Sequence, residues 1–206
     1  MIYDVAIIGG GVAGVSCALV LGSALEKPFA QDKKVAIFTH QKASSLQNGL
    51  YNNAYGIPPG TTGQELMRSS LEHLSTQYPK VTQIADQKIL ALSKSSDGYF
   101  VIQSADEIFE ARQVVVAVGS ASAFIIAGLE DYVIPHPKAK AEKRRIALKN
   151  QDHWVAEGLY VAGTLAGHRS QLSIAAGSGA SVATDIASIW NDNQPTQIHD
   201  SVPQSV

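Results

Sequence analysis

Cysteine is almost missing from this chain, since Cys17 is the single cysteine among 206 residues. One thiol excludes both an internal disulfide and a C-x-x-C redox pair. Alanines and leucines surround Cys17 in a predicted helix. We therefore interpret it as a small buried hydrophobic side chain and not as a reactive thiol.

A strong charge of either sign is also missing, because 16 Lys and Arg nearly balance 18 Asp and Glu, for a net charge of −2. Without a basic field, nucleic acid is not an expected partner. No apolar run reaches membrane-spanning length, so no membrane contact is expected. The six histidines are scattered without metal-ligand spacing, which predicts no metal site. A first strand without a basic leader favours a cytoplasmic location.

The stretch 5–14 is the segment around which the predicted fold is built. The apolar run Val5-Ala6-Ile7-Ile8 predicts a buried parallel strand. Gly9, Gly11 and Gly14 then follow in G-x-G-x-x-G spacing and open a predicted helix. In that pattern the first glycine allows the turn, the second lets a pyrophosphate approach, and the third lets helix and strand pack closely. The helix N-terminus would attract the phosphates. The alternative is a glycine-rich turn without a ligand.

Further segments predict the rest of an α/β fold. A second strand at 35–38 ends at Thr39 and His40, where dinucleotide-binding folds usually carry an acid for the ribose. A long loop at 41–62 leads to a helix that Thr62 would cap, with Glu65 at capping-box spacing. Three short runs, at 89–92, 99–102 and 108–111, predict an antiparallel meander. Two glycine-ended runs, at 114–119 and 159–163, predict parallel strands. The Ala-rich segment 171–189 predicts a last helix.

Two segments are less clear. Within 120–145, the basic run 138–145 is interpreted as solvated surface and not as a phosphate or nucleic-acid patch. The apolar run Ala123–Ala127 is either an exposed face for a partner or part of the core. From Asn191 the chain is polar and carries two prolines, which predicts a loose tail at 191–206.

The glycine loop, the strand that ends Ala117-Val118-Gly119, and the segment Glu157–Thr164 follow one another as in a known family. Together they resemble the FAD-binding domain of the pyridine nucleotide-disulfide oxidoreductases, most of all that of the thioredoxin reductases. Asn53–Pro58 and Gln171–Gly179 resemble this family's loop and last helix. The family's nicotinamide domain and its C-x-x-C pair are missing. The resemblance implies a single FAD-binding domain at 1–190, with halves 1–119 and 146–190 joined by a short linker.

The implied fold is a Rossmann-like parallel sheet with helices on one face and a three-stranded antiparallel meander. The implied cofactor is FAD, and Thr39 and Thr164 stand where the family usually has acids. By position, the resemblance implies these cofactor contacts: Gly9, Gly11, Val12, Ala13 and Gly14 for the pyrophosphate; Thr39 and His40 for the ribose; Lys88 and Ile89 for the adenine; Asn53 for the isoalloxazine; Ala117, Val118 and Gly119 at the middle strand end; Gly163 and Thr164 for the ribityl chain; and Gln171, Leu172 and Ser173 for the flavin O2 region.

These implications favour a small thioredoxin-reductase-like flavoprotein that receives electrons from outside, either from a partner protein or from free reduced nicotinamide. Two alternatives stay open: a non-catalytic regulatory module that binds FAD or another nucleotide, and a subunit whose missing half is a separate chain. A homo-oligomer, such as a homodimer, is expected. No residue stands out as catalytic; His168, in the turn before the last helix, is the least unfavourable candidate for a base.

Overall fold

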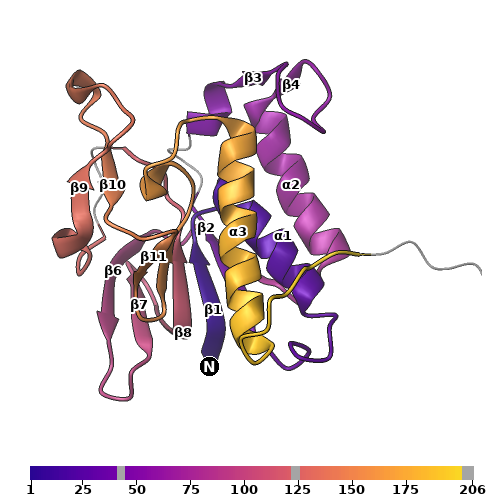
Figure 1. Ribbon diagram of the computed structural model, residues 1–206, viewed down its shortest axis with the longest axis vertical. Helices are drawn as coiled ribbons and strands as arrows, with labels where there is room; N and C mark the ends of the chain where they lie inside the picture. The colour runs from indigo at the N-terminus through magenta and orange to yellow at the C-terminus, as the bar shows by residue number, and fades with distance from the viewer. Residues whose placement is uncertain (41–44, 122–125, 201–206) are drawn as a thin grey trace, which may run out of the picture.

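The computed structural model describes residues 1–40, 45–121 and 126–200. Its central sheet has the strand order β11-β12-β8-β1-β2-β5 (Figure 1). Strands β12, β8, β1, β2 and β5 run parallel, and β11 pairs antiparallel with β12 at the edge. The bounds are Trp154–Ala156 for β11, Leu159–Val161 for β12, Ile108–Val116 for β8, Ile2–Ile8 for β1, Val35–Thr39 for β2 and Thr82–Ala85 for β5.

The predicted meander is present as β6 (Ile89–Lys94), β7 (Phe100–Ser104) and the first half of β8. The sequence predicted two separate strands where the structure has the single strand β8. The first half of β8 pairs antiparallel with β7, and its second half pairs parallel with β12. Because β1 runs beside both halves, one continuous strand serves the meander and the parallel sheet.

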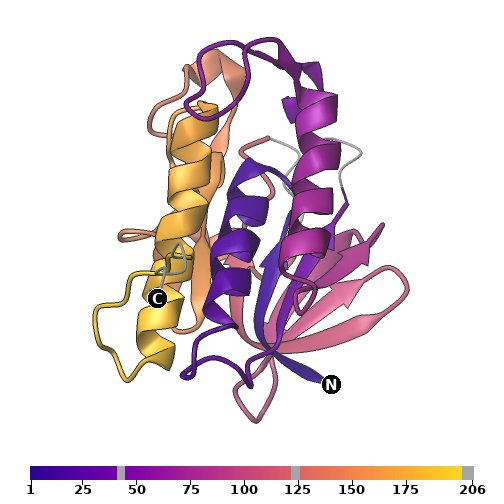
Figure 2. The same cartoon turned by 90° about the vertical axis from the view of Figure 1, so that its right-hand side faces the viewer.

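In the part of the chain that the structure describes, three helices cover one face of the sheet, as the sequence predicted (Figure 2). They are α1 (Val12–Ala24), α2 (Gly63–Gln77) and α3 (Leu172–Trp190). Helices α1 and α3 lie together, and the Ser16 hydroxyl donates to the Ala176 carbonyl across a distance of 2.8 Å. The predicted cap of α2 is confirmed, because the Thr62 hydroxyl accepts from the Glu65 N–H at 3.2 Å.

Both faces of the sheet are buried, which explains its unbroken apolar strands. In β1, Val5 and Ile7 face a core shared with the helices, whereas Ala6 and Ile8 face a core shared with the meander. Strands β2, β8 and β12 alternate in the same way. The molecule therefore has three layers, and residues just beyond the carboxyl ends of the strands lie at one edge of the middle layer.

Two small hairpins lie outside the central sheet at the end toward which β1 runs (Figure 1). One joins β3 (Leu50–Tyr51) to β4 (Thr61–Thr62), and the other joins β9 (Val133–Pro135) to β10 (Ile146–Leu148). Within the described residues, four 3-10 helices connect elements, at Ser45–Asn48, Glu130–Tyr132, Ala141–Lys143 and Gly163–Ala166. Residues 123–125 of the apolar run lie outside the described residues, and Ile126 is buried in the core.

The segment 191–200, for which the sequence predicted a loose tail, makes contacts with the helices. Ile198 is buried in a cluster with Ala24 and Ala187. The Asp200 carboxylate accepts hydrogen bonds from the hydroxyls of Ser23 and Tyr78. These contacts place the described part of the tail across the C-terminal end of α1.

Acid should release this tail. The hydrogen bond from Tyr78, then that from Ser23, hold the pKa of Asp200 below its ordinary value. A lowered pKa in the folded state stabilises docking above the ordinary Asp pKa of about 3.9, and this contribution is lost as the pH falls through the lowered value. We expect unchanged NMR relaxation of residues 196–200 from pH 5 to 8 and loss of order only at lower pH. D200N should loosen the tail at neutral pH; an equally ordered D200N tail would contradict this account.

Helix α3 is long and apolar enough, at 19 residues and a mean hydropathy of 1.2, to pass a membrane-helix test by length and composition alone. The sequence analysis predicted no apolar run of membrane-spanning length. Val182, Ala183 and Ile186 of α3 are fully buried against α1 and the sheet. Core helices of globular domains pass the same test, so this single helix is weak evidence for a membrane span.

Candidate functional site

The carboxyl ends of four parallel strands meet at one edge of the sheet. The Ala117 N–H donates to the Ile8 carbonyl at 2.8 Å, and the Ala162 N–H donates to the Val116 carbonyl at 3.0 Å. On the other side of β1, the Gly9 N–H donates to the Phe38 carbonyl at 3.0 Å. The residues just after β1, β2, β8 and β12 are therefore neighbours, as ligand-binding residues are in open parallel sheets.

The glycine loop is tightly packed at Gly9 and Gly14. Gly9 has φ +121°, and a Cβ there would lie 2.5 Å from the Ala117 carbonyl oxygen. A Cβ at Gly14 would lie 1.8 Å from the Gly9 carbonyl oxygen. No other residue fits these two positions without moving backbone, which agrees with the roles that the spacing predicts.

Gly11 differs, because a Cβ built on it meets no described atom within 4 Å. It is the N-cap of α1, and in the described structure this helix has no side-chain cap and no acid in its first turn. Helix α2, by contrast, is capped by Thr62 and has Glu65 in its first turn. The N-terminus of α1 thus keeps its positive end uncompensated beside open space, which fits a phosphate.

Two further predicted segments lie against this loop. A Cβ at Gly163 would lie 2.9 Å from the Ala13 methyl group. A Cβ at Gly119 would lie 4.0 Å from the Thr164 hydroxyl. The structure therefore brings together three groups that are far apart in sequence: residues 9–14, 117–119 and 163–164.

The end of β2 adds Thr39 and His40. Thr39 is buried, and the Nδ1 atom of His40 is buried without a hydrogen-bond partner among the described residues. The Asp86 N–H donates to the Thr39 carbonyl at 3.4 Å, which brings the segment before Lys88 and Ile89 to this strand end. A buried imidazole nitrogen without a partner is costly, so a ligand hydroxyl at this position would satisfy it.

The remaining predicted contacts lie farther out. Asn53 is exposed on the β3–β4 loop, and Gln171 is the exposed N-cap of α3, followed by Leu172 and Ser173 in the first turn. Figure 1 shows both segments at the end of the molecule where β1 ends. Both segments thus lie toward the carboxyl edge of the sheet, and Asn53 is exposed there.

A hydrogen-bond network of histidines next to Gly163 and Thr164 was not predicted from the sequence. The Ser178 hydroxyl accepts from the Gly163 N–H at 2.8 Å and lies 2.9 Å from His153 Nε2. His136 Nδ1 accepts from the Lys138 N–H, so its Nε2 carries the proton and donates to the Thr164 carbonyl at 3.0 Å. The backbone of Gly163 and Thr164 is therefore held by side chains from α3 and from the β9–β10 hairpin. Histidines so far apart in sequence give no spacing signal.

His168, the candidate base, takes part in the same network. Its Nε2 lies 3.1 Å from His153 Nε2. Burial lowers the pKa of His168, and the neighbouring His153 lowers it further. His153 is buried at the end of a turn in which Asp152 and His153 have φ +47° and +73°. We therefore interpret His168 as a residue that holds the loop after Gly163.

Ser178→Ala should destabilise this loop. Removal of the hydroxyl leaves the buried Gly163 N–H without an acceptor, which costs about 1–3 kcal/mol. Urea unfolding measures this loss. Thr184→Ala is the matched control on α3, because among the described residues the Thr184 hydroxyl bonds only the Ser181 carbonyl of the same helix. Equal stability of the two variants would contradict a positioning role for Ser178.

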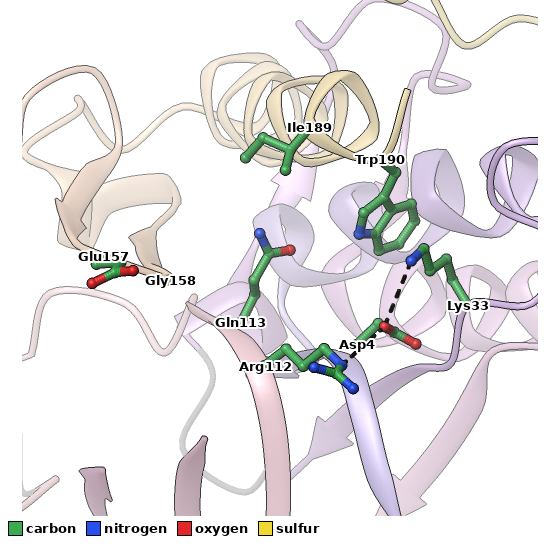
Figure 3. A pocket seen from close by; sticks show the side chains of 8 residues that line it. All are labelled: Asp4, Lys33, Arg112, Gln113, Glu157, Gly158, Ile189 and Trp190. Carbon is green, nitrogen blue, oxygen red and sulfur yellow. Dashed lines mark ion pairs between the residues drawn. The ribbon is translucent and has the colours of Figure 1, made fainter. Parts of the chain in front are cut away.

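One pocket in the described structure lies elsewhere, at the amino ends of β1 and β2 (Figure 3). It has a volume of about 320 Å³. The Asp4 carboxylate is shared by two cations, Lys33 at 3.9 Å and Arg112 at 3.5 Å. None of the predicted cofactor contacts lines this pocket, so we do not assign it to the dinucleotide. Its lining residues are Asp4, Lys33, Arg112, Gln113, Glu157, Gly158, Ile189 and Trp190.

The sheet order, the meander and the glycine-ended strands define a Rossmann-like FAD-binding fold. Thioredoxin reductase from Gloeobacter violaceus has this fold, with a TM-score of 0.69, 15% identity and coverage of 98% of this chain and 99% of that chain. A ferredoxin-flavin thioredoxin reductase from Clostridium acetobutylicum gives a TM-score of 0.67 at 18% identity, covering 94% and 99%. At these identities the likeness shows the fold alone.

The family model described as pyridine nucleotide-disulphide oxidoreductase matches residues 3–180, and the chain belongs to this family of oxidoreductases. A ferredoxin–NADP reductase 1 from Lysinibacillus sphaericus is 28% identical over 123 residues, which are 57% of this chain and 32% of the relative. A ferredoxin–NADP reductase from Limosilactobacillus reuteri is 31% identical over 123 residues, 58% of this chain and 35% of the relative. The aligned part is thus about a third of the length of these relatives.

Proposed function

We propose that the chain binds one FAD at the carboxyl edge of its parallel sheet and acts as an oxidoreductase with an external electron donor. The single observation that carries this proposal is the open, uncapped N-terminus of α1 beside Gly11, next to three glycine-ended strands. The backbone of residues 9–14 would hold the pyrophosphate, Thr39 and His40 the ribose, and Gly163 and Thr164 the ribityl chain. Bound FAD would supply the hydride and electron transfer chemistry.

The electron donor in this proposal is a molecule separate from the chain. Between Gly119 and Ile146 the chain has no second glycine-rich nucleotide loop. The names of the relatives include ferredoxin and NADP, and one structural neighbour is titled a ferredoxin-flavin enzyme. We therefore propose that electrons come from a separate carrier protein or from free reduced nicotinamide, neither of which needs a second domain in this chain.

Disulfide reduction by a thiol of this chain is not part of the proposal. Cys17 is fully buried in α1, and burial raises the pKa of its thiol strongly. The thiolate is the reactive form, so this cysteine is inert. Any disulfide substrate would have to be reduced by a partner.

Spectroscopy of the purified protein tests the proposal. We expect flavin absorbance at one FAD per chain, after reconstitution if necessary, and bleaching by reduced ferredoxin or by NADPH under anaerobic conditions. Flavin that dithionite reduces but neither donor does would instead favour the non-catalytic module. A protein that takes up no FAD would contradict the oxidoreductase and any module that binds FAD.

The regulatory module keeps one observation in its favour. Thr39 and Thr164 stand where the family usually has acids, so two charged contacts to a nucleotide are replaced by neutral ones. We also retain two further proposals, a cytoplasmic location and a homo-oligomer. Sedimentation of the flavin-loaded protein measures the oligomeric state.

A further inference from the structure

A basic loop stands beside the proposed flavin site. Residues 138–145, called the basic loop below, contain five of the 16 Lys and Arg of the chain and only one of its 18 acids. All five cations, Lys138, Lys140, Lys143, Arg144 and Arg145, are exposed. None of them has an ion-pair partner among the described residues. The loop is thus a concentrated positive surface on a protein of net charge −2.

The structure fixes this loop to the site. It follows β9 and ends just before β10, and the His136 N–H donates to the Arg145 carbonyl at 3.0 Å across its base. His136 Nε2 donates to the Thr164 carbonyl, and Gly167 lies against Pro137. Figure 1 shows the hairpin at the end of the molecule toward which β1 runs. A charge placed here therefore acts beside the segment that would contact the ribityl chain.

An exposed apolar side chain lies at the same edge, since Ile174, in the first turn of α3, is 40% exposed. Apolar side chains with charge at their rim are typical of protein interfaces. Charge at the rim mainly steers the encounter and raises the association rate, which suits short-lived electron-transfer complexes.

We propose that the basic loop is the docking surface for an acidic electron-carrier protein that reduces the bound flavin. This inference rests on the proposed function, because it names the partner of that site. Charge complementarity carries it: five unpaired cations spread over eight consecutive residues fit an extended acidic surface better than a single phosphate. Two one-electron carriers and two protons complete the reduction of one flavin, so the carrier is the only reductant required.

The test is anaerobic stopped-flow reduction of the FAD-loaded protein by reduced bacterial ferredoxin, chosen as an acidic carrier. Charge reversal of two loop residues, K140E with K143E, should lower the second-order rate constant at least about tenfold at low salt. The difference should shrink at about 0.5 M salt, where screening shortens the range of the field. The control, K34E with K94E, makes the same change in net charge at exposed positions outside the loop and should change the rate less than about twofold.

The outcomes separate the two proposals. Equal rates for the loop and control variants, both carrying flavin that dithionite reduces, would overturn the docking inference and leave the proposed function intact. A loop variant that loses reduction by NADPH but keeps the ferredoxin rate would assign the loop to a nucleotide and also overturn it. Failure of the wild-type chain to bind FAD would overturn the proposed function and the inference with it.

Discussion

Gly11→Asp should weaken FAD binding strongly without unfolding the protein. A side chain at Gly11 meets no described atom within 4 Å, and the backbone there, with φ −82°, suits any residue. Aspartate is also a favourable N-cap, so the stability of α1 should stay the same or rise by a few tenths of a kcal/mol. In the complex, however, the carboxylate would occupy the space of the pyrophosphate and repel it. Since like charges in contact cost several kcal/mol, we expect FAD affinity to fall at least about 100-fold.

Flavin fluorescence quenching measures the affinity in this experiment, and thermal unfolding of the flavin-free protein measures the stability. Ser96→Asp is the matched control, because it adds the same charge to the exposed β6–β7 turn. It should leave FAD affinity unchanged. If Gly11→Asp binds FAD as tightly as the wild type, the pyrophosphate does not lie at the α1 N-terminus.

Two glycines on α3 should respond in opposite directions to the same substitution. A Cβ at Gly179 would lie 2.0 Å from the Ala13 carbonyl oxygen of α1, whereas a Cβ at Gly177 meets nothing within 4 Å. Gly179→Ala must push α1 and α3 apart and should cost about 3 kcal/mol. Gly177→Ala only removes a flexible residue from a helix interior and should gain about 0.5–1 kcal/mol.

Thermal unfolding distinguishes these two variants. For a domain of this size, the expected shifts are a fall in Tm of about 6–12 °C for Gly179→Ala and a rise of about 1–4 °C for Gly177→Ala. Each variant is the control for the other, because both place one methyl group on the same helix. Similar Tm values would mean that α1 and α3 do not make the close contact described here.

The sequence predicted the elements that have strong local signals. The run before Gly9 predicted β1, the glycine spacing predicted the turn into α1, and Thr62 with Glu65 predicted the start of α2. The parallel sheet with helices on one face and a three-stranded meander followed from the family resemblance, and the structure confirms it. These features depend on residues close in sequence, or on patterns that recur in many chains.

Long-range contacts between polar side chains were not predictable from the sequence. The bonds of His136 and Ser178 to the Gly163 loop, and the contact of His153 with Ser178, join residues from separate elements, and no spacing in the chain signals them. The contacts of Asp200 with Ser23 and Tyr78 are of the same kind, since a polar sequence gives no sign of a distant partner. The fusion of two predicted strands into β8 depends on β7 and β12 sharing one neighbour.

Calorimetric titration of the flavin-free protein, once with FAD and once with FMN, most directly tests the claim that the carboxyl edge of the sheet binds FAD. In the proposed complex, the adenosine and pyrophosphate half of FAD lies on the glycine loop and on the end of β2. This arrangement sets the expected result. It therefore predicts one FAD per chain and at least about 100-fold weaker binding of FMN, which has no adenosine and only one phosphate. Equal affinities for FAD and FMN, or no binding of FAD, would contradict it.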